Sequence, residues 1–212
     1  AAIAIQDRDW QAVMVLTDTI SEHSPSRYFA ALVKAWALVA TGQGDAGITH
    51  LMEIQADGKE KVTPPNLHVE LQAALMAEHL GLNDEATRQG LGLVDTPMSP
   101  LVALHLASLL ARNGEQKAAE KLISLRLNTN FNRRAISTFL TTESQNEPPL
   151  LLTNLAHGII DFSLLAHNKS EQQILPARLQ LAQFLDPNSD ITHLLLAQQQ
   201  MKTTNYSNAS AN

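Results

Sequence analysis

The sequence predicts an all-α protein, and three observations support this fold class. Ala and Leu are abundant, and no stretch alternates β-branched and polar residues as a half-buried strand would. Proline and glycine divide the chain into helix-length segments joined by very short turns. Hydrophobic residues make up 44% and charged residues 17% of the 212 positions, a composition that can bury a core. We therefore expect paired antiparallel helices.

Each expected helix begins at a polar or proline residue and ends at a glycine, a proline or a polar turn. The first helix follows an acidic turn, and the later ones start after proline-containing or glycine-containing breaks. Caps or first-turn prolines are expected at Pro25, Asp45, Asn83–Asp84, Ser99 and Pro100. Together these signals predict helices at 9–20, 25–40, 45–58, 63–81, 83–95, 99–112 and 115–126.

The turns recur along the chain with a nearly constant spacing. Gly42, Gly81 and Gly114 each follow a long apolar helix, and they lie 39 and 33 residues apart. Small residues also recur in pairs 12 positions apart, at the points where the two helices of one unit would cross. These pairs are Ala35 with Gly47, Ala74 with Ala86, Ala107 with Ala119, and Ala197 with Ala209. A helix–turn–helix unit repeating about every 34 residues is typical of tetratricopeptide proteins.

On these residues the chain resembles the tetratricopeptide-repeat (TPR) superfamily. It resembles more narrowly a group of bacterial, largely α-proteobacterial, repeat proteins. That likeness rests on Ala35-Trp36-Ala37, Gly42-Gln43-Gly44-Asp45, Leu67-His68, His79-Leu80-Gly81, 109–115, Leu185-Asp186-Pro187 and 194–197. The chain departs from the pattern because Ala or Leu replaces several large aromatic residues, and aromatics make up only 4%. The resemblance implies an α-solenoid, a right-handed superhelix of stacked antiparallel helix pairs.

The period is interrupted once, and this interruption predicts the domain organisation. We expect an N-terminal TPR-like array at 1–128, an irregular insertion at 129–147 with a degenerate helix at about 132–140, and a C-terminal array at 148–212. A plain surface insertion between repeats is the favoured explanation of the middle segment. Both ends of the chain read as cut within a repeat. This pattern predicts either a segment of a longer protein or a homo-oligomer formed through unpaired terminal helices.

Composition excludes several classes of function and partner. Lys and Arg total 15 against 21 Asp and Glu, for a formal charge of −6, so we expect no nucleic-acid partner. The chain has no cysteine, which excludes disulfides, thiolate nucleophiles and cysteine-ligated zinc. The longest apolar stretch, 150–166, is interrupted by polar residues, so no transmembrane segment is expected. The initial Ala and the high Gln, Asn, Ser and Thr content favour an exported, periplasmic bacterial protein slightly over a cytoplasmic one.

No motif predicts catalysis, a metal site or a cofactor. His68 and His79 lie eleven residues apart on one expected helix, about 16 Å along its axis, so one ion cannot bridge them. His50 with Glu53 and His157 with Asp161 have one-turn spacing, which is common for exposed helix pairs. The sequence contains no HExxH and no GxSxG motif. We therefore expect no catalytic residue, and the protein is predicted not to be an enzyme.

The remaining candidate site is a groove lined by the first helix of each unit. Its expected residues combine aromatic, imidazole and cationic groups that suit an extended peptide: Phe29, Trp36, His68, Leu75, His79, Ser108, Arg112, Gln198 and Lys202. We expect Arg112 and Lys202 to be the more exposed contacts, and ordinary packing between helices is the slightly favoured explanation of Phe29, Trp36 and Leu75. The leading function is a non-enzymatic scaffold that binds a protein or peptide partner. The alternatives are a self-assembling structural repeat protein and an all-α enzyme with a helical toroid.

Overall fold

The computed structural model describes residues 2–20, 27–56, 65–126, 133–164, 169–189, 191–197 and 199. These residues form helices, turns and short connections, and no strand occurs among them. The all-α prediction is confirmed for this part of the chain. The chain divides into two compact units, one formed by Ala1–Val33 with Leu152–Asn212 and the other by Lys34–Leu151. We call them the first unit and the second unit and describe each by itself.

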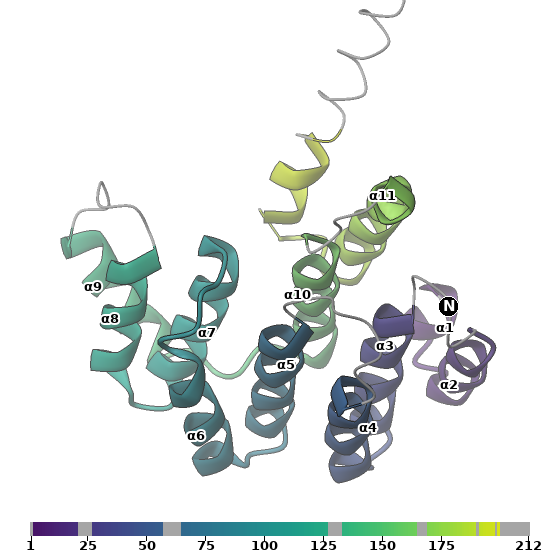
Figure 1. Ribbon diagram of the computed structural model, residues 1–212, viewed down its shortest axis with the longest axis horizontal. Helices are drawn as coiled ribbons and strands as arrows, with labels where there is room; N and C mark the ends of the chain where they lie inside the picture. The colour runs from purple at the N-terminus through teal and green to yellow at the C-terminus, as the bar shows by residue number, and fades with distance from the viewer. Residues whose placement is uncertain are drawn as a thin grey trace, which may run out of the picture. The chain divides into compact units, whose positions relative to one another are not determined.

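The second unit consists of helices that follow one another as antiparallel neighbours (Figure 1). Helix α5 packs against α4 and α6, α7 packs against α6 and α8, and α9 packs against α7 and α8. The helices are α3 (Arg27–Ala40, from Lys34 onward), α4 (Gly44–Ala56), α5 (Pro65–His79), α6 (Asn83–Leu93), α7 (Pro100–Arg112), α8 (Gln116–Arg126) and α9 (Arg133–Glu143). The helices predicted between residues 25 and 126 are therefore present. Their predicted ends at 25, 58 and 63 lie outside the described residues, and the described ends differ from the prediction by at most two residues.

The three recurrent glycines make the turns that join helices in pairs. Gly42, Gly81 and Gly114 have φ angles of 78°, 76° and 85°, the left-handed conformation that glycine adopts without strain. The residue after each glycine donates its backbone N–H to the carbonyl five positions earlier, at 2.8–2.9 Å. The glycine itself donates to the carbonyl three positions earlier, at 2.9–3.1 Å. All three turns are Schellman motifs, which satisfy the last carbonyls of α3, α5 and α7.

Small residues lie where paired helices approach each other. A Cβ placed on Gly47 of α4 would lie 2.6 Å from the backbone oxygen of Ala35 in α3, so the predicted crossing of these two residues is confirmed. The other complete pairs within the described residues are fully buried, on helices that pack together: Ala74 with Ala86, and Ala107 with Ala119. Ala209, the predicted partner of Ala197, lies outside the described residues. At Gly47 this close approach leaves no room for a larger side chain.

The helix starts show one confirmed cap and two corrections. Ser99 caps α7, because its side chain accepts a hydrogen bond of 3.3 Å from the backbone N–H of Val102. The cap of α6 is Leu82, without a side-chain bond, and Asp84 lies in the first turn rather than at the cap. Asp45 likewise lies in the first turn of α4. The Schellman turns start the next helix sooner than expected, and carboxylates in its first turn still interact favourably with the helix dipole.

The first unit combines the two ends of the chain. Helix α1 packs on both α2 and α11, and Ile5 and Val13 are completely buried there. Its helices are α1 (Ala2–Gln6), α2 (Trp10–Asp18), the start of α3, α10 (Leu151–Leu164, from Leu152 onward) and α11 (Lys169–Leu185), with a further helical stretch at 191–197. The helix expected at about 132–140 is α9 of the second unit. The domain boundaries at 128 and 147 stay predictions.

Candidate functional site: polar contacts between successive first helices

Trp36 joins the first helices of two successive pairs. Its indole N–H donates a hydrogen bond of 3.0 Å to the side-chain oxygen of Gln72 on α5. Both side chains are completely buried. The Trp36 ring also meets the ring of His79 edge to face, with centroids 5.9 Å apart and planes at 74°. Trp36 is thus part of the packing between α3 and α5, and it does not line an open surface.

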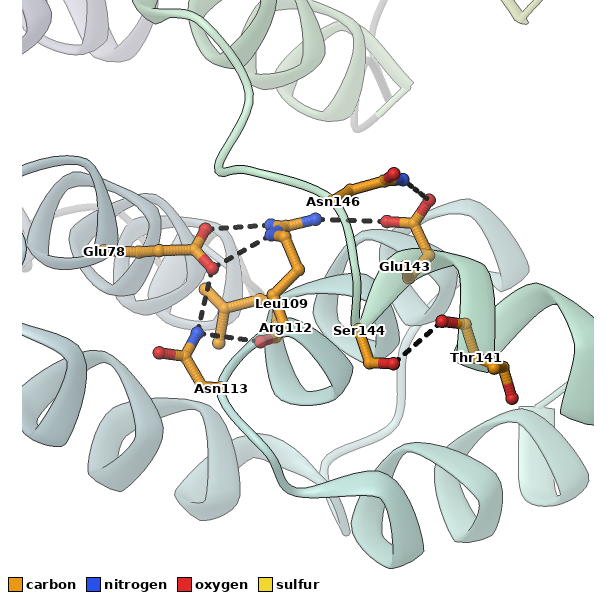
Figure 2. Close-up of polar contacts among 8 residues, drawn as sticks. All are labelled: Glu78, Leu109, Arg112, Asn113, Thr141, Glu143, Ser144 and Asn146. Carbon is orange, nitrogen blue, oxygen red and sulfur yellow. Dashed lines mark hydrogen bonds and ion pairs between the residues drawn. The ribbon is translucent and has the colours of Figure 1, made fainter.

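A cluster of charged side chains joins the next two first helices, as Figure 2 shows. Arg112, the last residue of α7, donates from Nε and Nη2 to the two oxygens of Glu78 on α5, at 3.0 and 2.8 Å. Its Nη1 donates to Glu143 at the end of α9, at 3.1 Å. The exposed fraction of the side chain is 6% for Arg112, 1% for Glu78 and 20% for Glu143. We call these three residues the Arg112 cluster.

Neighbouring amides complete the hydrogen bonds of the two carboxylates. The Nδ2 atom of Asn113 donates to Glu78 at 2.8 Å and to the backbone oxygen of Leu109 at 2.8 Å (Figure 2). The Nδ2 atom of Asn146 donates to Glu143 at 3.2 Å. The two carboxylates lie at the C-terminal ends of α5 and α9, where the helix dipoles are negative. The Arg112 guanidinium is the cation that compensates this charge within the cluster.

The spacing of these contacts matches the spacing of the turns. Trp36 and Gln72 are 36 residues apart, Glu78 and Arg112 are 34 apart, and Arg112 and Glu143 are 31 apart. The first two bonds therefore link the first helices of successive helix pairs, and the third links α7 to α9.

A second set of contacts ties α8 to the loop that follows α6. Lys121 of α8 pairs with Asp95 at 2.8 Å, and Arg126 donates to the backbone oxygens of Asp95 and Thr96 at 3.1 and 3.0 Å. The hydrogen bond from Lys121 and its positive charge, with a smaller contribution from Arg126, lower the pKa of Asp95. This pair is exposed on the surface, whereas the Arg112 cluster is enclosed.

The structure distributes the nine predicted groove residues among different environments. Trp36, His68 and Leu75 are buried, at 0%, 4% and 3% exposure, which is the outcome that ordinary packing predicts. His79 and Ser108 are half-buried in the second unit. Phe29 belongs to the first unit, where the guanidinium of Arg178 lies 5.2 Å from its ring centroid. Gln198 and Lys202 lie outside the described residues.

Arg112 is the residue whose environment differs most from the expectation. We expected an exposed contact, but two carboxylates enclose its side chain. Sequence reasoning also missed Glu78 as the partner of Arg112 and Gln72 as the partner of Trp36. Both are polar residues on the mostly apolar helix α5, a pattern that signals a buried partner.

No protein-family model matches the chain, and neither the curated proteins nor the solved structures contain a significant match to it. Within the described ranges, no three His, Asp or Glu side chains form a group that could hold a metal ion. None of the helices in the part of the chain that was searched is long and apolar enough to cross a membrane.

Proposed function

We propose that the chain is a non-enzymatic interaction scaffold of the tetratricopeptide type, which presents a concave helical face to a protein or peptide partner. In this proposal its helix pairs stack as a right-handed superhelix. The observation that supports it best is the series of polar contacts between α3, α5, α7 and α9, each about one repeat length apart. Three Schellman turns at glycines with the same recurrence give independent support.

The partially exposed side of α7 is the part of the second unit that best suits a partner. Leu101, Leu104 and Ser108 are half-buried and lie three and four residues apart, so they follow one face of the helix. The residues between them are almost all buried, including Ala103 and Leu106. This half-exposed strip, Leu101–Leu104–Ser108, offers apolar contact area with one hydroxyl, which suits an apolar segment of a peptide.

Site-specific photocrosslinking in native extract tests the proposal. A photoreactive side chain at Ser108 should give a discrete adduct with one partner. The matched control is the same side chain at Glu120, which is exposed on α8, the second helix of the same pair. In the proposed array that helix faces away from the partner. The same adducts from both positions, or none from Ser108, would contradict the proposal, and an adduct of two copies of this chain would favour self-assembly instead.

A further inference from the structure

We propose that α9 is a detachable helix, held on α7 and α8 by a latch that consists of the ion pair between Arg112 and Glu143. Opening the latch would release α9 from the other helices of the second unit while they stay folded. It would also uncover the faces of α7 and α8 against which α9 packs. The inference concerns a conformational change and does not depend on the proposed scaffold function.

Four of the six described side chains of α9 are polar and exposed: Ser137, Thr138, Thr141 and Thr142. Leu140 is buried, at 0% exposure. Helix α9 packs on α7 and α8 and has one face open to water. Elements with such an exposed face are among those that open locally at a lower free energy than the core of a protein.

Local features also weaken the C-terminal half of α9. The hydroxyl of Thr141 donates to the backbone oxygen of Ser137 at 2.8 Å, and that of Thr142 donates to Thr138 at 3.0 Å. Such bonds from threonine to the carbonyl four residues earlier slightly destabilise a helix. Glu143 is the last residue of α9, where a negative charge opposes the helix dipole. The ion pair with Arg112 offsets this unfavourable interaction, and α9 makes it only when docked.

The Arg112 cluster is asymmetric, and this asymmetry indicates which contact opens. Arg112 makes two bonds to Glu78 and one to Glu143. Glu78 is almost inaccessible to water, at 1%, whereas Glu143 is exposed at 20% and accepts another bond from Asn146. Water can therefore replace Arg112 at Glu143 far more easily than at Glu78. The bond between Nη1 of Arg112 and Glu143 is the contact that breaks when α9 leaves.

Hydrogen–deuterium exchange of the full chain, read by mass spectrometry, tests the latch. Glu143→Gln keeps the shape and a hydrogen-bond acceptor but removes the charge. It should speed the exchange of α9 amides about tenfold, the factor expected for loss of one charge-assisted bond. Exchange in α5 to α8 should change less than about twofold. The matched control, Glu120→Gln on the exposed side of α8, should leave α9 unchanged.

The dependence of the α9 exchange rate on salt provides a second measurement. It distinguishes an ion pair of Glu143 from a contribution of its side chain to packing alone. Raising NaCl from about 0.1 M to about 1 M shortens the screening length from about 10 Å to about 3 Å. In the unmodified chain this increase should speed exchange in α9, and in the Glu143→Gln variant the effect should be smaller. The proposal is overturned if α9 exchanges at the same rate in both proteins. It is also overturned if α5 to α8 accelerate by the same factor as α9, because α9 would then be part of one cooperative unit.

Discussion

Replacing Arg112 by Met removes the cation from between two carboxylates and should strongly destabilise the second unit. Glu78, at 1% exposure, would keep only the bond from Asn113 and would have almost no access to water. Glu143, at 20%, would be partly hydrated. Removing one partner of a buried ion pair costs about 3–5 kcal/mol. Because Asn113 still satisfies one oxygen of Glu78, we expect a loss near the lower limit, about 3 kcal/mol.

A second substitution distinguishes the destabilisation caused by an unpaired buried charge from the destabilisation caused by lost packing. The double variant Glu78→Leu with Arg112→Met removes both charges and keeps apolar groups of similar length. Such replacements are often neutral or stabilising. We expect the double variant to lie within about 1 kcal/mol of the original protein, so that the second substitution restores about 2 kcal/mol.

Urea unfolding followed by tryptophan fluorescence measures these differences. The chain has two tryptophans, and a Trp10→Phe background leaves Trp36 as the reporter of the second unit. Arg88→Met on α6 is the control, because Arg88 pairs with Glu85 at an exposed site, and its unfolding midpoint should not move. The reasoning is refuted if Arg112→Met unfolds at the same urea concentration as the background, or if the double variant is no more stable than Arg112→Met alone.

Three further predictions concern the packing in the second unit. Gly47→Ala should cost about 1–3 kcal/mol in urea unfolding because its Cβ would lie 2.6 Å from the Ala35 oxygen. Gly92→Ala on α6 has open space around its Cβ and should stabilise by about 0.5 kcal/mol; equal effects of the two substitutions would contradict the assigned crossing. Trp36→Phe should cost about 1–3 kcal/mol because it leaves the buried oxygen of Gln72 without its donor, and unchanged thermal stability by circular dichroism would argue against that bond.

The helices and turns of the second unit were largely predictable because the sequence marks its turns and its closest crossing locally. A glycine after an apolar helix, as at Gly81, predicts a left-handed turn from the conformational freedom of a single residue. The pairing of Ala35 with Gly47 was predictable because only small residues permit such a close approach. The caps of α4 and α6 were less predictable, because Asp45 and Asp84 stabilise a first turn as readily as a cap.

The candidate site was less predictable because burial depends on neighbouring helices. Arg112 lies on the same half-exposed face of α7 as Ser108, and nothing in its local sequence shows that carboxylates 34 and 31 residues away enclose it. The surroundings of Trp36 depend in the same way on Gln72, which lies on another helix. The available signal was Glu78, an acid within a mostly apolar helix, because a buried carboxylate requires a partner. That partner, Arg112, lies 34 residues away on α7.

The short reach of the interhelical bonds has a consequence for how the second unit folds during synthesis. The bonds described here join residues 26 to 36 positions apart, between one helix pair and the next. Contacts of such limited sequence separation give fast folding, because little chain entropy is lost before each contact forms. Once one helix pair and the next have left the ribosome, the polar contacts between them can form. We therefore expect the second unit to assemble in the order of translation, with α9 joining last.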